Sequence, residues 1–223
     1  MMNRDRVSVF LECLRGPIAL PPYLKALERA ALADRVPIIR PDTQSFLQTL
    51  LLIKKPVRIL EVGCAVGFSA LLMHETCPEA AIVTIEKDEE RAAQAAASFF
   101  ERGVLASEAE AGEICLLTGD ADDILKNLAE AGEHFDLIFM DAAKGQYLTW
   151  LPLIKMLLGK DGVLLSDNVL REGDILESHY AVERRDRTIY KRMRAYLHAL
   201  THDDELQTTI LSDGDGLAMT VKK

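Results

Sequence analysis

The sequence predicts an α/β fold with a mostly parallel sheet that ends in an antiparallel hairpin. Three observations support this prediction. From residue 57 onward, short apolar runs rich in β-branched residues alternate with longer helical stretches. These runs are apolar at nearly every position, which is typical of parallel strands covered on both faces. Near the C-terminus, two strand-like segments flank a turn-forming cluster at residues 212–216, which predicts a hairpin.

The elements follow in order along the chain. We expect three helices first, at residues 5–14, 22–34 and 42–54, the last two opened by prolines. The expected strands are Val57–Val62, Ala81–Ile85, Ile114–Leu117, Leu137–Met140, Val163–Leu165, Leu206–Leu211 and Leu217–Val221. The expected intervening helices are 67–76, 89–102, 121–131, 146–158 and 174–201. We therefore interpret residues 1–223 as one domain, with a helical cap at 1–55 and a catalytic core at 56–223.

Composition narrows the class of protein further. The chain has 223 residues, 49% of them hydrophobic, and a formal charge of −9. It contains no apolar run near the ~18 residues that a membrane span requires, and no export signal precedes the first helix. Its four cysteines are widely separated, which predicts reduced thiols rather than a disulfide framework. We expect a soluble cytoplasmic protein that makes no membrane contact.

A glycine loop follows the first predicted strand. It reads Glu61-Val-Gly63-Cys-Ala-Val-Gly67-Phe-Ser69, and its glycines allow a sharp turn with close approach of a ligand. The third glycine of a dinucleotide-binding loop is missing, which argues against a dehydrogenase. An acid two residues before Gly63 suits a cationic ligand without phosphates. Glu86 ends the second strand, where a carboxylate can accept both ribose hydroxyls, and Gly119-Asp120-Ala121 follows the third strand, where an adenine would lie.

Two acids and an amide follow the fourth and fifth predicted strands. Asp141 ends one strand and Asp167-Asn168 ends the next, so adjacent parallel strands should bring them to one edge of the sheet. Three oxygen ligands of this kind suit Mg²⁺ or Mn²⁺, with positions left for water and substrate. Lys144 lies three residues after Asp141. Asp136, at the beginning of the same strand, is interpreted as a structural residue that fixes a loop.

These residues resemble the metal-dependent O-methyltransferases of the catechol and caffeoyl-CoA type. The resemblance runs from about Val36 to the C-terminus and includes the Gly214-Asp215-Gly216 turn. It implies a Rossmann-like class I methyltransferase fold with seven strands in the order 3-2-1-4-5-7-6. It also implies S-adenosylmethionine as cofactor, with Mg²⁺ or Mn²⁺ held by Asp141, Asp167 and Asn168. Lys144 is then the catalytic base, with Asp141 beside it. The implied cofactor-binding residues are Ile39, Glu61, Gly63, Ser69, Glu86, Asp120, Ala121 and Asp141.

The methyl acceptor is the least determined part of the prediction. Residues 184–194 hold six Lys or Arg and one Asp, a basic run in an acidic chain. This run resembles the bacterial branch that converts 5-hydroxyuridine at the tRNA wobble position to 5-methoxyuridine. A uracil hydroxyl and its neighbouring carbonyl oxygen can chelate a metal much as a catechol does. We therefore expect the tRNA anticodon loop as substrate, with phosphates contacted by Arg184, Arg185, Arg187 and Arg192.

Two other functions stay open. One is a small-molecule O-methyltransferase of catechol or caffeoyl-CoA type, whose acceptor is a phenol with two adjacent oxygens. The other is a noncatalytic nucleotide- or RNA-binding module with the same fold, which the intact Asp141, Lys144, Asp167 and Asn168 disfavour. A homodimer is also expected, with the helical cap as one candidate interface. The acidic connection at residues 103–112 is assigned no function.

Overall fold

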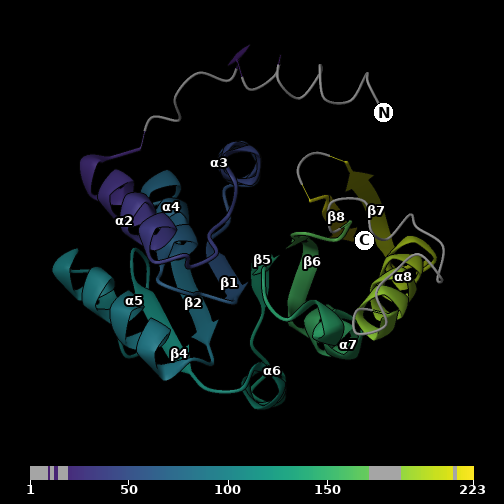
Figure 1. Cartoon of the computed structure of the whole chain (residues 1–223). Helices are drawn as coiled ribbons and strands as arrows, with labels where there is room; N and C mark the ends of the chain where they lie inside the picture. The colour runs from purple at the N-terminus through teal and green to yellow at the C-terminus, as the bar shows by residue number, and fades with distance from the viewer. Residues whose placement is uncertain (1–9, 11–12, 15–19, 171–186, 213–214) are drawn as a thin grey trace.

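The computed structural model describes residues 10, 13–14, 20–170, 187–212 and 215–223 (Figure 1). Most of the helix predicted at 5–14, and the first half of the one predicted at 174–201, lie outside these residues. The centre of the fold is an eight-stranded sheet in the order β3-β4-β2-β1-β5-β6-β8-β7. The strands are β1 (Arg58–Val62), β2 (Ala81–Glu86), β3 (Leu105–Ala106), β4 (Ile114–Thr118), β5 (Phe135–Met140), β6 (Leu158–Ser166), β7 (Leu206–Leu211) and β8 (Leu217–Lys222).

The sheet confirms the predicted mixture of directions. All pairs from β3 to β6 are parallel, whereas β8 runs antiparallel to both β6 and β7. Without β3, the strands numbered along the chain follow the predicted order 3-2-1-4-5-7-6. The predicted number of seven strands was one too low. The extra strand, β3, lies in the connection at 103–112, and its two residues are too few to show a pattern.

The sheet lies between two groups of helices, because its strands are apolar on both faces. On one face pack α2 (Pro22–Ala33), α3 (Pro41–Lys54), α4 (Phe68–Thr76) and α5 (Glu89–Glu101). On the other face pack α6 (Ala121–Glu130), α7 (Tyr147–Leu157) and α8 (Arg187–Thr201). A short 3-10 turn, η1 (Lys144–Gln146), precedes α7. Figure 1 shows the two groups on opposite sides of the central strands.

Local chemistry explains where several helices begin. Prolines occupy the first turn of α2 and α3, where no backbone donor is needed. Asp88 caps α5 by accepting a hydrogen bond from the Arg91 amide, and Asp120 caps α6 in the same way through Asp122. The predicted bounds of these helices lie within two residues of the observed ones. In the described part of the chain, no helix combines the length and the apolar character needed to cross a membrane.

Asp136 has the structural role predicted for it. Its Oδ2 atom accepts hydrogen bonds from the backbone amides of Val57, at 2.8 Å, and Arg58, at 2.9 Å. The carboxylate at the start of β5 thus fixes the start of its neighbour β1. The acid therefore lies at the opposite end of the strands from Asp141 and takes no part in the site described below.

Candidate active site

A cleft of about 660 Å³ opens at the carboxyl ends of the parallel strands. Ligands bind at this edge in open α/β sheets, and the volume suits a drug-sized molecule. Loops after β1, β2, β4, β5 and β6 line it, together with the segment that leads into α3. Among its lining residues are Ile39, Gly63, Ser69, Glu86, Asp120, Ala121, Asp141, Lys144, Asp167 and Asn168. The predicted cofactor, metal and base residues therefore share one cavity, with Glu61 as the exception.

The glycine loop passes very close to the end of β5. Gly63 has a φ of +103°, and a Cβ atom placed there would lie 2.2 Å from the Asp141 carbonyl oxygen. Only glycine allows this approach. Gly67, with a φ of +85°, begins α4 against the ring of Phe99. Gly63 thus lets the loop pack directly against the Asp141 backbone, and Gly67 lets the start of α4 pack against Phe99.

Glu86, at the end of β2, is hydrogen-bonded to the glycine loop. Its Oε2 atom accepts a hydrogen bond from the Ala65 amide at 2.7 Å, and its Oε1 atom accepts from the amides of Lys87 and Asp88, both at 2.9 Å. A carboxylate offers about four acceptor positions. Three are used, so Glu86 is fixed in place and still lines the cleft with an acceptor position to spare.

Glu61 lies behind the cavity lining rather than in it. The side chain is fully buried, and its Oε2 atom accepts a hydrogen bond from the Thr84 hydroxyl. In the described part of the chain its Oε1 atom has no hydrogen-bond partner. Burial raises the pKa of this carboxyl from 4.5 to about 7. The hydroxyls of Ser69 and Thr84 oppose the shift, and the charges of Asp141 and Glu86 add to it. Glu61 would therefore influence the cofactor through its charge, from behind the glycine loop, rather than by direct contact.

Asp120 combines two contacts at the far end of the cleft. Its Oδ1 atom caps α6, and its Oδ2 atom accepts a hydrogen bond from Lys87 Nζ at 2.5 Å. This contact with Lys87 lowers the pKa of the Asp120 carboxyl. Trp150, which also lines the cleft, donates its indole N–H to Asp122. Trp150 is thus a buried residue at the boundary between the core and the cleft.

Asp141 and Asp167 meet at the same edge because the backbone pairing of the strands continues into them. The Asp141 amide donates to the Val62 carbonyl, and the Asp167 amide donates to the Met140 carbonyl. Asp167 is buried, and its Oδ1 atom accepts from the Asn168 amide at 2.7 Å and from the Thr43 hydroxyl at 3.5 Å. Burial, followed by the charge of Asp141, raises the pKa of Asp167 to about 7.

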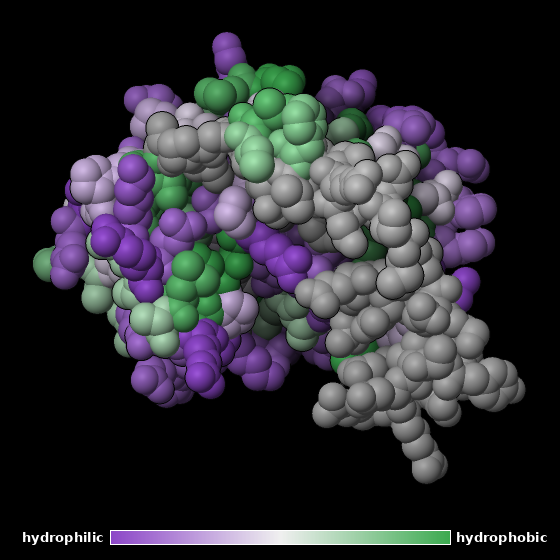
Figure 2. Space-filling view, turned by 45° about the horizontal axis from the view of Figure 1, so that its top comes forward, coloured by the Kyte–Doolittle hydropathy of each residue, from purple (hydrophilic) through white to green (hydrophobic). Residues whose placement is uncertain are grey.

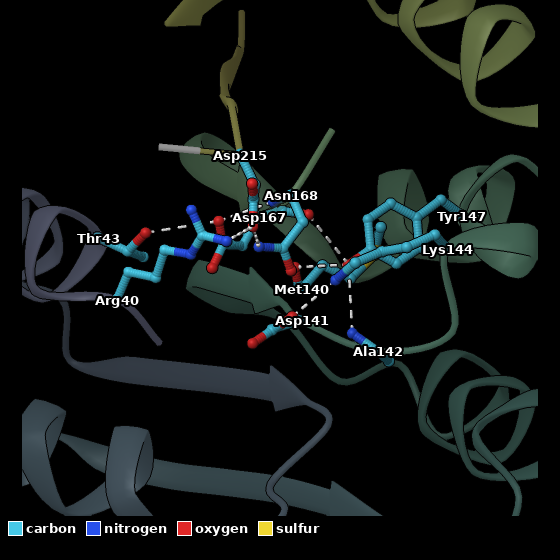
Figure 3. A network of polar contacts seen from close by, with 10 residues as sticks. All are labelled: Arg40, Thr43, Met140, Asp141, Ala142, Lys144, Tyr147, Asp167, Asn168 and Asp215. Atoms are coloured by element: carbon cyan, nitrogen blue, oxygen red, sulfur yellow. Dashed lines mark hydrogen bonds and ion pairs between the residues drawn. The ribbon is translucent and has the colours of Figure 1, made fainter. Parts of the chain in front are cut away.

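Lys144 points toward these acids (Figure 3). Its Nζ atom donates to Asp141 Oδ1 at 2.7 Å and to the Tyr147 hydroxyl at 3.1 Å. Tyr147 is fully buried; its hydroxyl donates to the Met140 carbonyl and accepts from the Ala142 amide. Burial raises the pKa of this phenol. The amine is therefore held by a neutral, rigidly placed hydroxyl on one side and a carboxylate on the other.

Two further residues approach the acids without having been predicted as site residues. Arg40, which precedes α3, forms an ion pair with Asp215 at 3.0 Å between Nη2 and Oδ2. The same Asp215 oxygen lies 3.4 Å from Asn168 Nδ2. Asp215 was noticed only as part of a turn and of a family motif. Its distance in the sequence from Asn168 gives no pattern that would reveal the contact.

The donor atoms suit a hard divalent cation. Asp141, Asp167 and Asn168 supply only oxygen ligands, and two carboxylates facing one cavity repel each other unless a cation lies between them. Asp215 lies close by, yet no three His, Cys, Asp or Glu side chains in the described residues converge as a metal-binding group. A metal here would therefore depend on the Asn168 amide as its third protein ligand.

The basic run is only partly described. Arg184 and Arg185 lie outside the described residues, and for Arg187 only the backbone, at the start of α8, is described. Arg192 donates to the Gly145 carbonyl at 3.1 Å, which ties α8 to η1. Arg194 donates to the Tyr190 hydroxyl at 2.7 Å. Among the described side chains of this run, those of Arg192 and Arg194 make hydrogen bonds within the protein.

Known proteins resemble this chain in both sequence and structure. A sequence profile described as O-methyltransferase matches residues 18–223. A catechol O-methyltransferase of Niastella koreensis is 31% identical over 83% of this chain and 82% of its own length. One from Mycobacterium tuberculosis is 32% identical over 78% and 76%. A Bacillus cereus O-methyltransferase in complex with S-adenosylhomocysteine superposes with a TM-score of 0.79 at 26% identity, covering 98% and 97% of the two chains.

The fold and the cleft define a class I methyltransferase, as predicted. The chain belongs to the O-methyltransferase family that includes the catechol and caffeoyl-CoA enzymes, and it is an S-adenosylmethionine-dependent O-methyltransferase. An S-adenosylhomocysteine-bound methyltransferase of Podospora anserina has the same fold, with a TM-score of 0.80 at 26% identity over 100% and 96% of the chains.

Proposed function

We propose that this enzyme methylates one of two adjacent oxygens on a small catechol-type phenol. The observation that carries the proposal is the single cleft in which Asp141, Lys144, Asp167 and Asn168 lie beside the glycine loop. The two catechol O-methyltransferases cited above match about four fifths of the chain and support the same acceptor class. Within the cleft, Ile39, Gly63, Ser69, Glu86, Asp120 and Ala121 are proposed to contact the cofactor, with Glu61 acting from below.

The proposed metal site consists of Asp141, Asp167 and Asn168. A bound Mg²⁺ or Mn²⁺ would supply Lewis acidity and a chelating template for two neighbouring substrate oxygens. The protein itself provides the rigid frame for that site. Backbone hydrogen bonds from Asp141 to β1 and from Asp167 to β5 fix both acids, and buried Tyr147 fixes the approach of Lys144. Such preorganisation lowers the cost of aligning the acceptor oxygen.

Lys144 is the proposed general base. The sulfonium of S-adenosylmethionine supplies the methyl group when the cofactor is bound. In the transfer, an O–CH₃ bond forms on the acceptor as the S–CH₃ bond breaks, and the hydroxyl proton passes to the Lys144 amine. Lys144 can accept this proton only as the neutral amine, so its ammonium, paired with Asp141 at 2.7 Å, must first release a proton to solvent. Gly63 packs the loop after β1 against the Asp141 backbone, which keeps that loop beside the proposed metal site.

The alternative acceptor is 5-hydroxyuridine in the tRNA anticodon loop. It rests on the basic run at 184–194 and on the vicinal oxygens of the modified base. Arg192 weakens this alternative, because its guanidinium is engaged with the Gly145 carbonyl. The cited relatives are named for small phenolic acceptors or their thioesters. The small phenol is therefore the principal proposal.

A labelled methyl-transfer assay tests the function directly. We expect wild-type protein with Mg²⁺ to methylate members of a catechol panel, and EDTA to abolish the reaction until metal is restored. Lys144→Ala should lower kcat by about 10²–10⁴-fold, the range for loss of a general base, with unchanged affinity for S-adenosylhomocysteine. Lys160→Ala, at an exposed site in β6, is the matched control. Full activity in EDTA would refute the metal proposal, and turnover of hydroxylated tRNA alone would favour the alternative acceptor.

A further inference from the structure

Asp215 is a mostly buried acid to which the mechanism above assigns no role. Its side chain is 14% exposed and lies beside Asn168 and Asp167 (Figure 3). Its Oδ2 atom accepts from Arg40 Nη2 at 3.0 Å and from Asn168 Nδ2 at 3.4 Å. Its Oδ1 atom is buried and has no hydrogen-bond partner among the residues that the structure describes. The contacts of Asp215 with Arg40 and Asn168 therefore involve only one of its two carboxylate oxygens.

The backbone around Asp215 is fastened to the segment that follows Asn168. The Val169 amide donates to the Gly216 carbonyl at 3.0 Å, and the Leu170 amide donates to the Asp215 carbonyl at 2.8 Å. Gly216 has a φ of +83°, and a Cβ atom there would lie 2.3 Å from Leu170 Cγ. The turn before β8 is thus packed tightly against residues 168–170. The Asp215 carboxylate is held at Asn168 by the main chain, independently of its own side-chain contacts.

The chemistry of the two side chains fixes the orientation of the amide. An ionised carboxylate only accepts hydrogen bonds, so the Asn168 branch that faces Asp215 must be the NH₂ group. The opposite orientation would place two acceptors against each other. The amide oxygen therefore occupies the other branch and remains available as a ligand. Asn168 itself has a φ of +55°, a left-handed conformation that asparagine tolerates better than most residues.

Asp215 does not fit the role of a direct metal ligand. Asp141, Asp167 and Asp215 do not converge as a group of three acids able to hold an ion. The Asp215 oxygen nearest to the site is already shared between Arg40 and Asn168. The Arg40 guanidinium also offsets the negative charge that Asp215 would add beside two other carboxylates. Its contacts instead match those of an outer-shell residue that orients a ligand.

We propose that Asp215 is a positioning residue, held by Arg40, that keeps the Asn168 amide oxygen turned toward the metal. This inference rests on the metal site of the proposed function. It extends that site to the C-terminal hairpin and to the segment before α3, which lie far apart in the sequence. Both segments would then contribute to metal affinity without touching the metal.

The test is a titration of the protein with Mn²⁺ in the presence of S-adenosylhomocysteine, in which electron paramagnetic resonance measures the bound Mn²⁺. Asp215→Asn should weaken Mn²⁺ binding by about tenfold or more, as expected for an outer-shell partner, while S-adenosylhomocysteine affinity and thermal stability stay close to wild type. Asp204→Asn makes the same change of charge at an exposed position after α8 and serves as the control. Equal Mn²⁺ affinity in wild type and Asp215→Asn would overturn the positioning role.

A double-mutant cycle separates positioning from direct ligation. With Asp141 and Asp167 still present, Asn168→Ala should bind Mn²⁺ more weakly. In that background Asp215→Asn should cause no further loss, because the amide through which Asp215 acts is gone. Additive losses would show that Asp215 acts on the metal independently and would overturn the proposal. Wild-type protein that binds no Mn²⁺ would instead refute the metal site and, with it, this inference.

Discussion

Glu61 places a carboxyl group in a fully buried position at the end of β1, with one oxygen unpaired. The Thr84 hydroxyl satisfies the other oxygen, and Ser69 lies near by. The pKa of about 7 means that this group ionises in the physiological range. Burying an ionised carboxylate without full hydrogen bonding is costly. Ionised Glu61 therefore lowers the stability of the unliganded protein and places a negative charge beneath the cleft in which we propose that the sulfonium cofactor binds.

This charge predicts how stability depends on pH. Because burial raises the pKa of Glu61 above its ordinary 4.5, the stabilising contribution of its proton is complete below pH 4.5 and is lost as pH rises through 7. The difference corresponds to about 3 kcal/mol. Glu61→Gln should therefore gain stability relative to wild type as pH rises from 4.5 to 8. Urea unfolding over this range measures it, with exposed Glu101→Gln as control. A constant difference between Glu61→Gln and wild type would contradict this assignment.

The location of a single residue could be predicted from the sequence when that residue lies at the end of a strand. Asp141 directly follows β5 and Asp167-Asn168 directly follows β6, and parallel strands carry such positions to one edge. Asp136 was assigned its structural role by the same reasoning, from the opposite end of the strand. Arg40 and Asp215 could not be placed, because they reach the site from loops whose paths depend on tertiary packing.

At the scale of elements, the turn after β1 depends on its close packing against β5. Gly63→Ala would bring a Cβ atom to 2.2 Å from a backbone oxygen, which cannot move aside like the end of a flexible side chain. We expect a loss of about 1–3 kcal/mol from overpacking, in addition to about 1–2 kcal/mol for the positive φ. Binding of S-adenosylhomocysteine, measured by calorimetry, should fall sharply as the loop shifts.

Gly103→Ala provides the matched control for this substitution. Gly103 also has a positive φ, of +69°, but no atom lies within 4 Å of the position that its Cβ would take. Gly103→Ala should therefore lose only the free energy that the positive φ costs a residue with a Cβ atom. Its affinity for S-adenosylhomocysteine should not change. If urea unfolding shows equal losses for the two variants, the close approach of Gly63 to Asp141 has no energetic importance.

Helices and strands with a regular pattern of apolar residues were predicted well, and the exceptions have physical causes. The start of β6 was missed because Gly159, Lys160, Asp161 and Gly162 lack the apolar pattern of a strand, and the pairing with β5 is irregular there. The two-residue β3 depends on its neighbour β4 for its hydrogen bonds rather than on its own sequence. The hairpin of β7 and β8 was predicted because its turn residues and its alternating strands agree.

At the scale of the whole molecule, the described surface mixes hydrophilic and hydrophobic groups. Figure 2 shows hydrophobic patches separated by hydrophilic side chains on the face that it presents. Leu52, Ile53 and Val57 are more than half exposed, at the end of α3 and just before β1. Exposed apolar groups near one another are common at protein interfaces. The expected homodimer stays a prediction. A measurement of the mass in solution tests it, and substitution of these exposed apolar residues would then test whether they form the interface.

The net charge bears on the choice of acceptor. A chain of −9 repels RNA except near the basic run at 184–194. We expect a labelled anticodon stem-loop to bind with a Kd of about 100 µM or weaker at physiological salt, the weak end of nonspecific nucleic-acid binding. Fluorescence anisotropy over a series of salt concentrations measures this affinity, and methylation of a catechol should be insensitive to added tRNA.

The opposite result has an equally definite signature. If the basic run contacts phosphates, the logarithm of the binding constant should fall with the logarithm of salt concentration by about 0.7 per contact on single-stranded RNA. Replacing Arg184 and Arg185 by Gln should then flatten the slope by about 1.4, while methylation of a free catechol barely changes. Loss of both activities in equal measure would mean that this segment supports the fold of the cleft rather than the binding of RNA. A tight, salt-sensitive complex with hydroxylated tRNA would overturn the small phenol as the principal acceptor, because the proposed metal site could chelate the adjacent oxygens of 5-hydroxyuridine as well as those of a catechol.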